Sequence, residues 1–227
     1  MKYLRKFETE SEAQMREKPN VSLIKTSYDN KTEIAFSRAL GVFIQHINGT
    51  LYTKEEWVNG GFSSADANGV AYCTLKVAFV ISKEELPATT WSSDTTNVVE
   101  GVIEETQSTL KVASDFYGVE NTAKILKTDV SGAAYCCANY TFPNGQKGYL
   151  GGAGEWLQLS KRFNDMNEAM LLIGATLKSK DYWTSTQYAG AGACYAAHGG
   201  YEGKYMIQAG EPKSQNVAVR PFTTLNF

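Results

Sequence analysis

The stretch Tyr182-Trp-Thr-Ser-Thr-Gln-Tyr188, followed after a bland tract by Asn216-Val-Ala-Val-Arg-Pro-Phe222, decides the fold of this chain. Between these blocks, residues 188–201 read YAGAGACYAAHGGY and contain only Ala, Gly, Tyr, Cys and His. A core strand needs large apolar side chains, and a catalytic strand usually carries acids, bases or a nucleophile with a partner. The tract has neither, so we interpret it as a surface on which side-chain identity is free to vary.

Length and charge limit the classes of function. A chain of 227 residues can bury a substantial core, as one large domain or as one domain with an appendage. Its 22 basic and 24 acidic residues nearly balance, which argues against nucleic acid as a partner because such binding normally leaves a basic stripe. The longest apolar runs are too short to span a bilayer, so we expect no membrane insertion.

The first residues, Met1–Lys18, contain basic side chains but no apolar core of a secretion signal. This pattern predicts a protein made in the cytoplasm without a signal peptide. If it acts on a virion or outside the cell, as the resemblance below implies, another route must carry it there.

Candidate catalytic and metal sites fail on their spacing. The two histidines, His46 and His198, lie far apart, and the four cysteines show neither metal nor redox spacing, which favours free and mostly buried thiols. Residues 148–154 are rich in glycine but match no phosphate-binding loop, so we interpret them as a close approach of backbone to a neighbouring element. Glu211-Pro-Lys213 is similar to a calcium-lectin tripeptide, yet Lys213 stands where an oxygen ligand is needed. The sequence predicts no catalytic residue, no metal and no cofactor.

The first 35 residues differ from the rest. Lys2–Lys18 predicts a short helix, Pro19-Asn20 breaks it, Val21–Ile24 predicts a strand, and residues 28–31 a turn. Because this segment cannot bury a core alone, we interpret residues 1–35 as an arm for attachment or oligomerisation. The alternative is a frayed terminus.

Residues 36–227 form the globular part, with helices in the middle and short strands at the end, an order that predicts an α+β fold. Expected strands are 41–47, turning at Asn48-Gly49 to 51–53, then 71–75, 77–81, 182–186, 193–198, 203–208 and 216–222, with a loop at 87–101. Expected helices are 118–127, 155–163 and one capped by Asn164 and ended by Gly174, which buries Met166, Ala169, Met170 and Ile173.

Four blocks together resemble the C-type-lectin-fold variable proteins of diversity-generating retroelements: Asn139–Leu150 (NYTFPNGQKGYL), Gly154-Glu-Trp156, Tyr182–Thr186 and Val219–Phe222. The same order is shared more loosely with the formylglycine-generating-enzyme-like branch of that fold. The resemblance covers residues 135–222 well and 35–134 weakly. The opening residues 2–9 (KYLRKFET) are similar to those of bacteriophage structural proteins.

This resemblance implies a C-type lectin fold without calcium and with a short N-terminal arm. Its ligand face would lie at about 182–220, held rigid by the Trp183 and Arg220-Pro-Phe222 blocks. In such systems template adenines are misread, so diversity concentrates at AAC-type codons. Changes in the first two bases of AAC reach every residue type found in 188–201. They do not reach the types of Glu202, Lys204, Met206, Gln208, Glu211 and Lys213, which we interpret as fixed by the template.

The resemblance also implies a function. It indicates a non-enzymatic protein for receptor recognition or adhesion by a phage or prophage particle, with a protein or glycan receptor on a target cell. Tyrosines would serve as aromatic anchors, with Ala and Gly giving concavity between them. Copies joined as a homo-oligomer, or on a virion through the arm, would raise avidity.

The candidate ligand-binding residues are Tyr188, Ala189, Gly190, Ala191, Gly192, Cys194, Tyr195, Ala197, His198, Tyr201, Gly203, Tyr205, Ile207, Ser214 and Asn216. We expect Tyr188, Tyr195, His198 and Tyr201 to point outward, and Trp183, Val219 and Phe222 to be buried. Two alternatives stay open. A formylglycine-generating-type oxidase needs a cysteine pair, of which only Cys194 is present near the C-terminus. A bacterial surface adhesin with a fixed ligand needs a secretion route.

Overall fold

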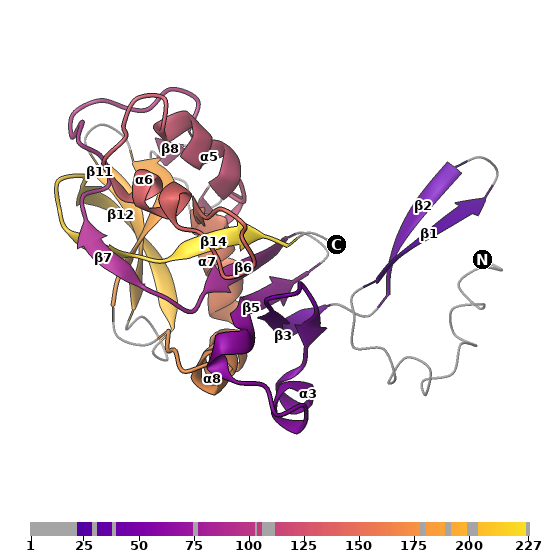
Figure 1. Cartoon of the computed structure of the whole chain (residues 1–227). Coiled ribbons are helices and arrows are strands. Elements are labelled where there is room, and N and C mark those ends of the chain that lie inside the picture. Colours follow the sequence, from indigo (N-terminus) through magenta and orange to yellow (C-terminus); the bar gives the residue numbers. More distant parts are fainter. Residues whose placement is uncertain are drawn as a thin grey trace.

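The computed structural model describes the backbone of residues 22–28, 31–37, 40–74, 77–102, 104–105, 112–177, 180–188, 192–198 and 204–225. Over these ranges the chain is α+β, with two larger sheets and several short helices (Figure 1). The helix expected at 2–18 lies outside the described residues. None of the described helices combines the length and apolarity needed to cross a bilayer.

The first larger sheet contains most of the early strands. Its order is β4 (Leu51–Tyr52), β3 (Gly41–His46), β5 (Ala67–Cys73), β6 (Ala78–Ser82), β14 (Pro221–Thr224) and β9 (Tyr149–Leu150), all antiparallel. β5 is buried along its whole length. The predicted turn at Asn48-Gly49 is confirmed, and Gly49 adopts φ +92°, a conformation that glycine enters without a Cβ clash.

The second larger sheet carries the C-terminal strands. Its order is β12 (Tyr205–Pro212), β11 (Gly192–His198), β10 (Tyr182–Tyr188), β13 (Val217–Val219) and β7 (Leu86–Thr89), with β8 (Glu104–Glu105) also beside β10. β7 corrects the expectation of a loop from residue 87. Pro87 lies in this strand at the sheet edge, where a missing N–H breaks no ladder.

The block 216–222 does not form one strand. β13 belongs to the second sheet and β14 to the first, and Arg220 stands between them. Trp183, Val219 and Phe222 are fully buried, as predicted. The block therefore joins the two sheets, a role that its sequence does not reveal.

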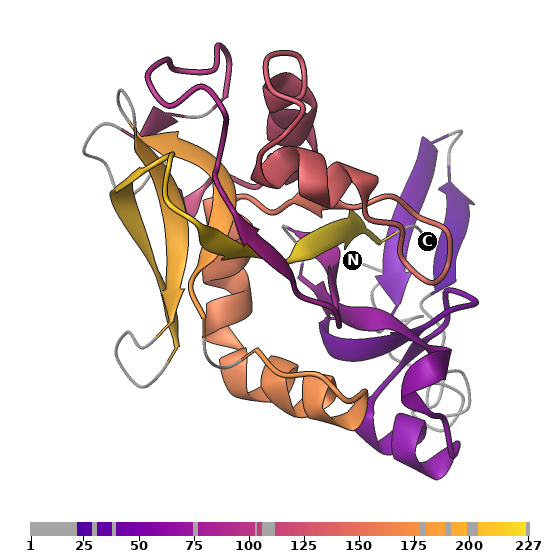
Figure 2. The same cartoon turned by 60° about the vertical axis from the view of Figure 1, so that its left-hand side comes forward.

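The helices are α3 (Lys54–Asn59), α5 (Gly118–Ile125), α6 (Ala133–Asn139), α7 (Ala153–Lys161) and α8 (Phe163–Leu172), with a 3-10 turn η1 (Ser64–Asp66). Figure 2 shows α7 beside strands β10–β12, with α8 continuing towards the elements of the first sheet. The expected Asn164 cap is wrong: α8 begins at Phe163 after Arg162, and no side chain caps it. Gly174, at φ +75°, follows its end as expected, and Met166, Ala169, Met170 and Ile173 are buried as predicted.

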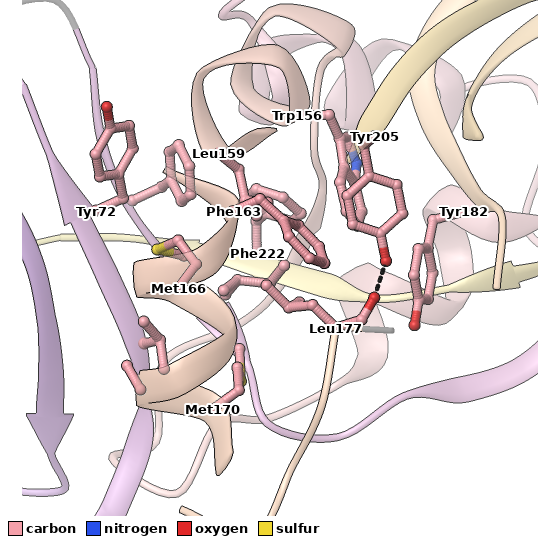
Figure 3. Packing of buried hydrophobic residues seen from close by; sticks show 14 of the residues in the cluster. Tyr72, Trp156, Leu159, Phe163, Met166, Met170, Leu177, Tyr182, Tyr205 and Phe222 are labelled. Atoms are coloured by element: carbon pink, nitrogen blue, oxygen red, sulfur yellow. Dashed lines mark hydrogen bonds between the residues drawn. The ribbon is translucent and has the colours of Figure 1, made fainter. Parts of the chain in front are cut away.

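The main core lies between α7, α8 and both sheets (Figure 3). Trp156 of α7 stacks on Tyr182 of β10, with ring centroids 5.1 Å apart, and meets the edges of Tyr205 and Phe222. The Tyr205 hydroxyl donates to the backbone oxygen of Leu177. Aromatic rings from four separate segments of the sequence thus form one packed cluster.

The N-terminal segment contains a hairpin. β1 (Ser22–Tyr28) pairs antiparallel with β2 (Lys31–Ser37), and with no other described strand. Tyr28 pairs with Lys31, while residues 29–30 of the expected turn lie outside the described residues. β1 is longer than the predicted strand at 21–24. Attachment or oligomerisation through residues 1–35 stays a prediction.

Candidate ligand-binding face

Strands β11 and β12 present two different faces. Ala196, Tyr182 and Tyr205 belong to the core beneath α7. On the opposite side, Trp183 pairs in register with Tyr195, and Tyr195 with Gln208. Successive side chains of a strand alternate between faces, so Met206 and Gln208 of β12 share this opposite side with Tyr195. We call Tyr195, Met206 and Gln208 the outer face.

The outer face combines an aromatic, a thioether and an amide. The half-buried Tyr195 meets the Trp183 ring edge-on at 6.3 Å, and its hydroxyl donates to Gln208 Oε1. Met206 is 45% exposed, and Gln208 is also exposed. Partial burial, together with the Glu211 carboxylate, raises the pKa of Tyr195, so its hydroxyl stays a neutral donor at pH 7.

Beyond the end of β12 lie two exposed segments, Thr96–Val98 and Ser214–Asn216, which we call the rim. Lys213 Nζ donates to the backbone oxygen of Asn97 at 2.7 Å and so joins the two halves. Ser214 and Asn216 were candidates from the sequence, whereas residues 96–98 were not. The available signal was the turn chemistry of Asp94, whose Oδ1 accepts the amides of Thr96 and Asn97.

Several candidates occupy other places. Tyr205 is only 4% exposed and Ile207 is half-buried against the core, so neither side chain belongs to the outer face. Contact of these two residues with ligand stays a prediction. Strand alternation turns these two side chains inward and Met206 and Gln208 outward. Tyr188 is half-buried against Val112 and Ala153 and is not the free anchor expected.

The remaining candidates are described only in part. Gly192 is buried in β11. The backbones of Cys194, Ala197 and His198 lie in β11, but their side chains fall outside the described set, as do Ala189, Gly190, Ala191, Tyr201 and Gly203 altogether. Neither the outward direction of His198 nor that of Tyr201 is therefore tested.

The outward residues of β12 bear on the interpretation of variability. Met206 and Gln208 are among the residue types that a rewritten AAC codon does not reach. The accessible side of β12 therefore carries template-fixed types at both of these positions.

The motif Tyr182–Thr186 serves the scaffold. The Trp91 indole N–H donates to the backbone oxygen of Thr184 at 2.7 Å. The Trp183 indole N–H donates to the backbone oxygen of Thr89 at 2.8 Å. The hydroxyl of Thr186 accepts the Ala153 amide at 3.0 Å, at the start of α7, and itself donates to Asp115. Polar side chains within a buried strand thus hold the flanking loop and helix.

Two buried carboxyl groups lie beneath this motif. Glu155 accepts the Gly152 amide at 2.6 Å, and its Oε1 lies 2.7 Å from the Tyr149 hydroxyl. Desolvation raises its pKa to about 8, and desolvation also raises the pKa of Asp115. Perturbed acids can mark active sites, but these two are enclosed by helices and strands, at 3% and 0% exposure. We interpret them as parts of a structural network.

The glycine-rich stretch behaves as predicted. A Cβ on Gly152 would lie 2.4 Å from the backbone oxygen of Asp115, and the Gly154 amide donates to that same oxygen at 3.0 Å. Only glycine allows this approach of the two backbones.

Arg220 fixes the junction between the sheets. Its guanidinium donates to the backbone oxygens of Ser82 at 3.0 Å and Thr176 at 2.9 Å, and lies 3.6 Å from the Glu85 carboxylate. Both the Trp183 and the Arg220 blocks are therefore structural anchors, in agreement with the rigid role that the resemblance implies.

Two surface hollows lie elsewhere. One of about 570 Å³ is lined by α3 and α8, and one of about 520 Å³ by residues of β5 and α7. Neither includes an outer-face or rim residue. Cys73 and Cys137 are buried free thiols, as expected, and Cys136 is half-buried and also free. The described side chains include no group of three His, Cys, Asp or Glu placed to hold a metal ion.

No protein-family model and no curated protein matches the sequence. Among solved structures, the fold is similar to that of a fimbrial protein from Bacteroides ovatus, with a TM-score of 0.61 at 13% identity. The similarity covers 91% of this chain and 57% of the fimbrial protein, so the chain spans little more than half of that protein's length. At such low identity the likeness concerns the fold alone.

Proposed function

We propose that this chain is a non-enzymatic ligand-binding protein of the adhesion type, and that it binds through the outer face and its rim. One observation carries the proposal: the same side of the sheet is covered at β10, half-buried at Tyr195 of β11 and accessible at β12. Trp183 lies beneath Trp91, Val99 and Ala133, whereas Met206 and Gln208 are exposed.

The side chains of the outer face suit contact with an uncharged region of a protein or glycan. Tyr195 offers a ring edge and a neutral hydroxyl, Gln208 an amide, and Met206 an adaptable apolar group. Such mixtures are common in binding sites that recognise proteins or glycans. We infer that folding depends on the buried blocks around Trp183 and Arg220 and not on the outer-face side chains. The outer face is therefore available for binding. The fimbrial protein of similar fold supports an adhesive role.

The finer proposal is a calcium-free C-type lectin fold displayed by a phage or prophage particle, with residues 1–35 as its attachment or oligomerisation arm. The buried Trp183 and Arg220 blocks support it. Diversification would then spare Met206 and Gln208, which are of unreachable types. Sequences from one clonal population would vary only within about residues 182–220.

A bacterial adhesin with a fixed ligand is the second candidate. The outward Met206 and Gln208, and the similarity in fold to a fimbrial protein, favour it. A uniform sequence in the clonal population, with no near-repeat template beside the gene, would select this candidate. Oxygen consumption that depends on added copper would instead support the oxidase alternative.

Binding itself is tested with the full chain. Biotinylated protein, assembled as tetramers on streptavidin, is incubated with a panel of intact bacterial strains, and bound fluorescence is measured by flow cytometry. We expect Met206→Glu to lose at least about 10-fold in labelling, because a charge is desolvated at the contact. Leu171→Glu is the matched control, since Leu171 is 59% exposed on α8, away from the outer face. Equal labelling by both variants would exclude the outer face as the binding site.

A further inference from the structure

The segment 90–102 follows β7 and contains neither helix nor strand, yet polar side chains that are themselves buried hold it at several points. Trp91 is fully buried, and its indole donates to Thr184 of β10. Gln187 of β10 accepts the Val99 amide at 2.9 Å and donates to the Val99 oxygen at 2.7 Å. This paired contact imitates a strand ladder, so the segment is fixed near both of its ends.

Lys213 holds the middle of the segment. It is 0% exposed, its ammonium lies 4.7 Å from the centre of the Trp91 ring, and it donates to the oxygen of Asn97. The Trp91 amide in turn donates to the oxygen of Lys213 at 2.9 Å. A buried ammonium loses its hydration and therefore requires such partners, and a cation over a desolvated tryptophan ring gains the most.

The hydrogen bond between Lys213 and Asn97 matters because of where Lys213 lies in the chain. It directly follows β12 and directly precedes Ser214–Asn216, and Asn97 lies within the other half of the rim. Lys213 is therefore a buried side chain that joins the two halves of the rim at the end of β12. Without it, the Asp94 turn would hold residues 96 and 97 only to their own segment.

We propose that Lys213 is a positioning residue for the ligand-binding face: it fixes Thr96–Val98 relative to Ser214–Asn216 before the ligand binds. This inference rests on the proposed function. A rim ordered in advance binds more tightly because less conformational freedom is lost on contact. It also assigns Thr96–Val98, which the sequence did not single out, to the binding surface.

The test uses Lys213→Met in the full chain, which keeps an apolar stem of similar length and removes the ammonium. Lys161→Met, at the exposed end of α7, is the matched control. Hydrogen–deuterium exchange is expected to become about 10-fold faster or more in peptides covering 94–99 and 213–217, and to stay unchanged in α8. Labelling of the bacterial strain that wild-type tetramers bind best is expected to fall about 5-fold or more.

The outcomes separate this inference from the proposed function. Unchanged exchange, or faster exchange with full labelling, overturns the positioning role even if Met206→Glu abolishes labelling. If neither Lys213→Met nor Met206→Glu affects labelling, the proposed face itself is wrong. Should Lys213→Met fail to fold, the wild-type chain decides: peptides covering 94–98 and 213–217 must exchange far more slowly than an open loop, and exchange at the rate of an open loop overturns the proposal.

Discussion

Replacing Glu155 by glutamine removes a buried acid at the junction of α5, α7 and β10. The carboxyl group contacts the Gly152 amide and the Tyr149 hydroxyl, and a Cβ on Gly118 of α5 would lie 2.4 Å from its Oε2. Burial raises the pKa of Glu155 from 4.5 to about 8. The folded protein therefore holds this proton over a pH range in which the unfolded chain releases it.

The sign and size of the effect follow from that difference. Because the folded pKa is the higher one, the stabilisation is fully present below pH 4.5 and is lost as the pH rises through about 8. At about 1.4 kcal/mol per pH unit, raising the pH from 5 to 8 should lower the free energy of unfolding by about 4 kcal/mol. The raised pKa of Asp115 acts in the same direction.

The assay is urea denaturation of the wild-type chain and Glu155→Gln at several pH values from 5 to 9. Glutamine mimics the protonated acid, so both proteins should unfold at similar urea concentrations at pH 5. Above pH 8 the variant should be the more stable one. Glu120→Gln, at an exposed position of α5, should keep the wild-type pH dependence. If Glu155→Gln loses stability with pH as steeply as the wild type, Glu155 is not the group that titrates.

Four further substitutions test the scaffold by urea denaturation at fixed pH. Trp183→Ala should lower the free energy of unfolding by about 3–5 kcal/mol, since it empties a fully buried site between β10 and the segment 90–102. A decrease of less than about 1 kcal/mol would contradict the packing described. Arg220→Met should lower the free energy of unfolding by about 3 kcal/mol, because the backbone oxygens of Ser82 and Thr176 lose their donor. An unchanged urea midpoint would show that these contacts do not contribute to stability. Gly210→Ala should lower the free energy of unfolding by about 1–2 kcal/mol, because Gly210 has φ +89°, which is unfavourable for a residue with a Cβ. Gly145 has φ +87°, so Gly145→Ala should lower it by a similar amount.

The sequence predicted the fold class and much of the buried framework. Periodicity identified α7 and the buried side of α8, and the large apolar and aromatic residues Trp183, Val219 and Phe222 were assigned to the core, as found. These predictions succeed because they depend on local patterns.

Other features depend on contacts between distant residues. Arg220 lies where the chain passes from β13 to β14, and its partners are the distant residues Ser82 and Thr176. α6 was missed because its sequence, AAYCCAN, offers small residues and no clear apolar stripe. The mistaken face of Tyr205 has a simple cause: the pairing register of a strand decides which side chains point outward, and no local signal set it for β12.

The central claim is that folding depends on the buried blocks while binding depends on the outer face and rim. A displayed library with all substitutions at Trp183, Met206, Gln208, Ser214 and Asn216 measures both, when each variant is scored for protease resistance and for labelling of the bacterial strain that the wild type binds. We predict that most substitutions at the four exposed positions leave protease resistance near the wild-type level, as surface changes usually do, and reduce labelling. Substitutions at Trp183 should lose both. Loss of protease resistance at Met206 and Gln208 as severe as at Trp183, or full labelling by every folded variant, would contradict the account.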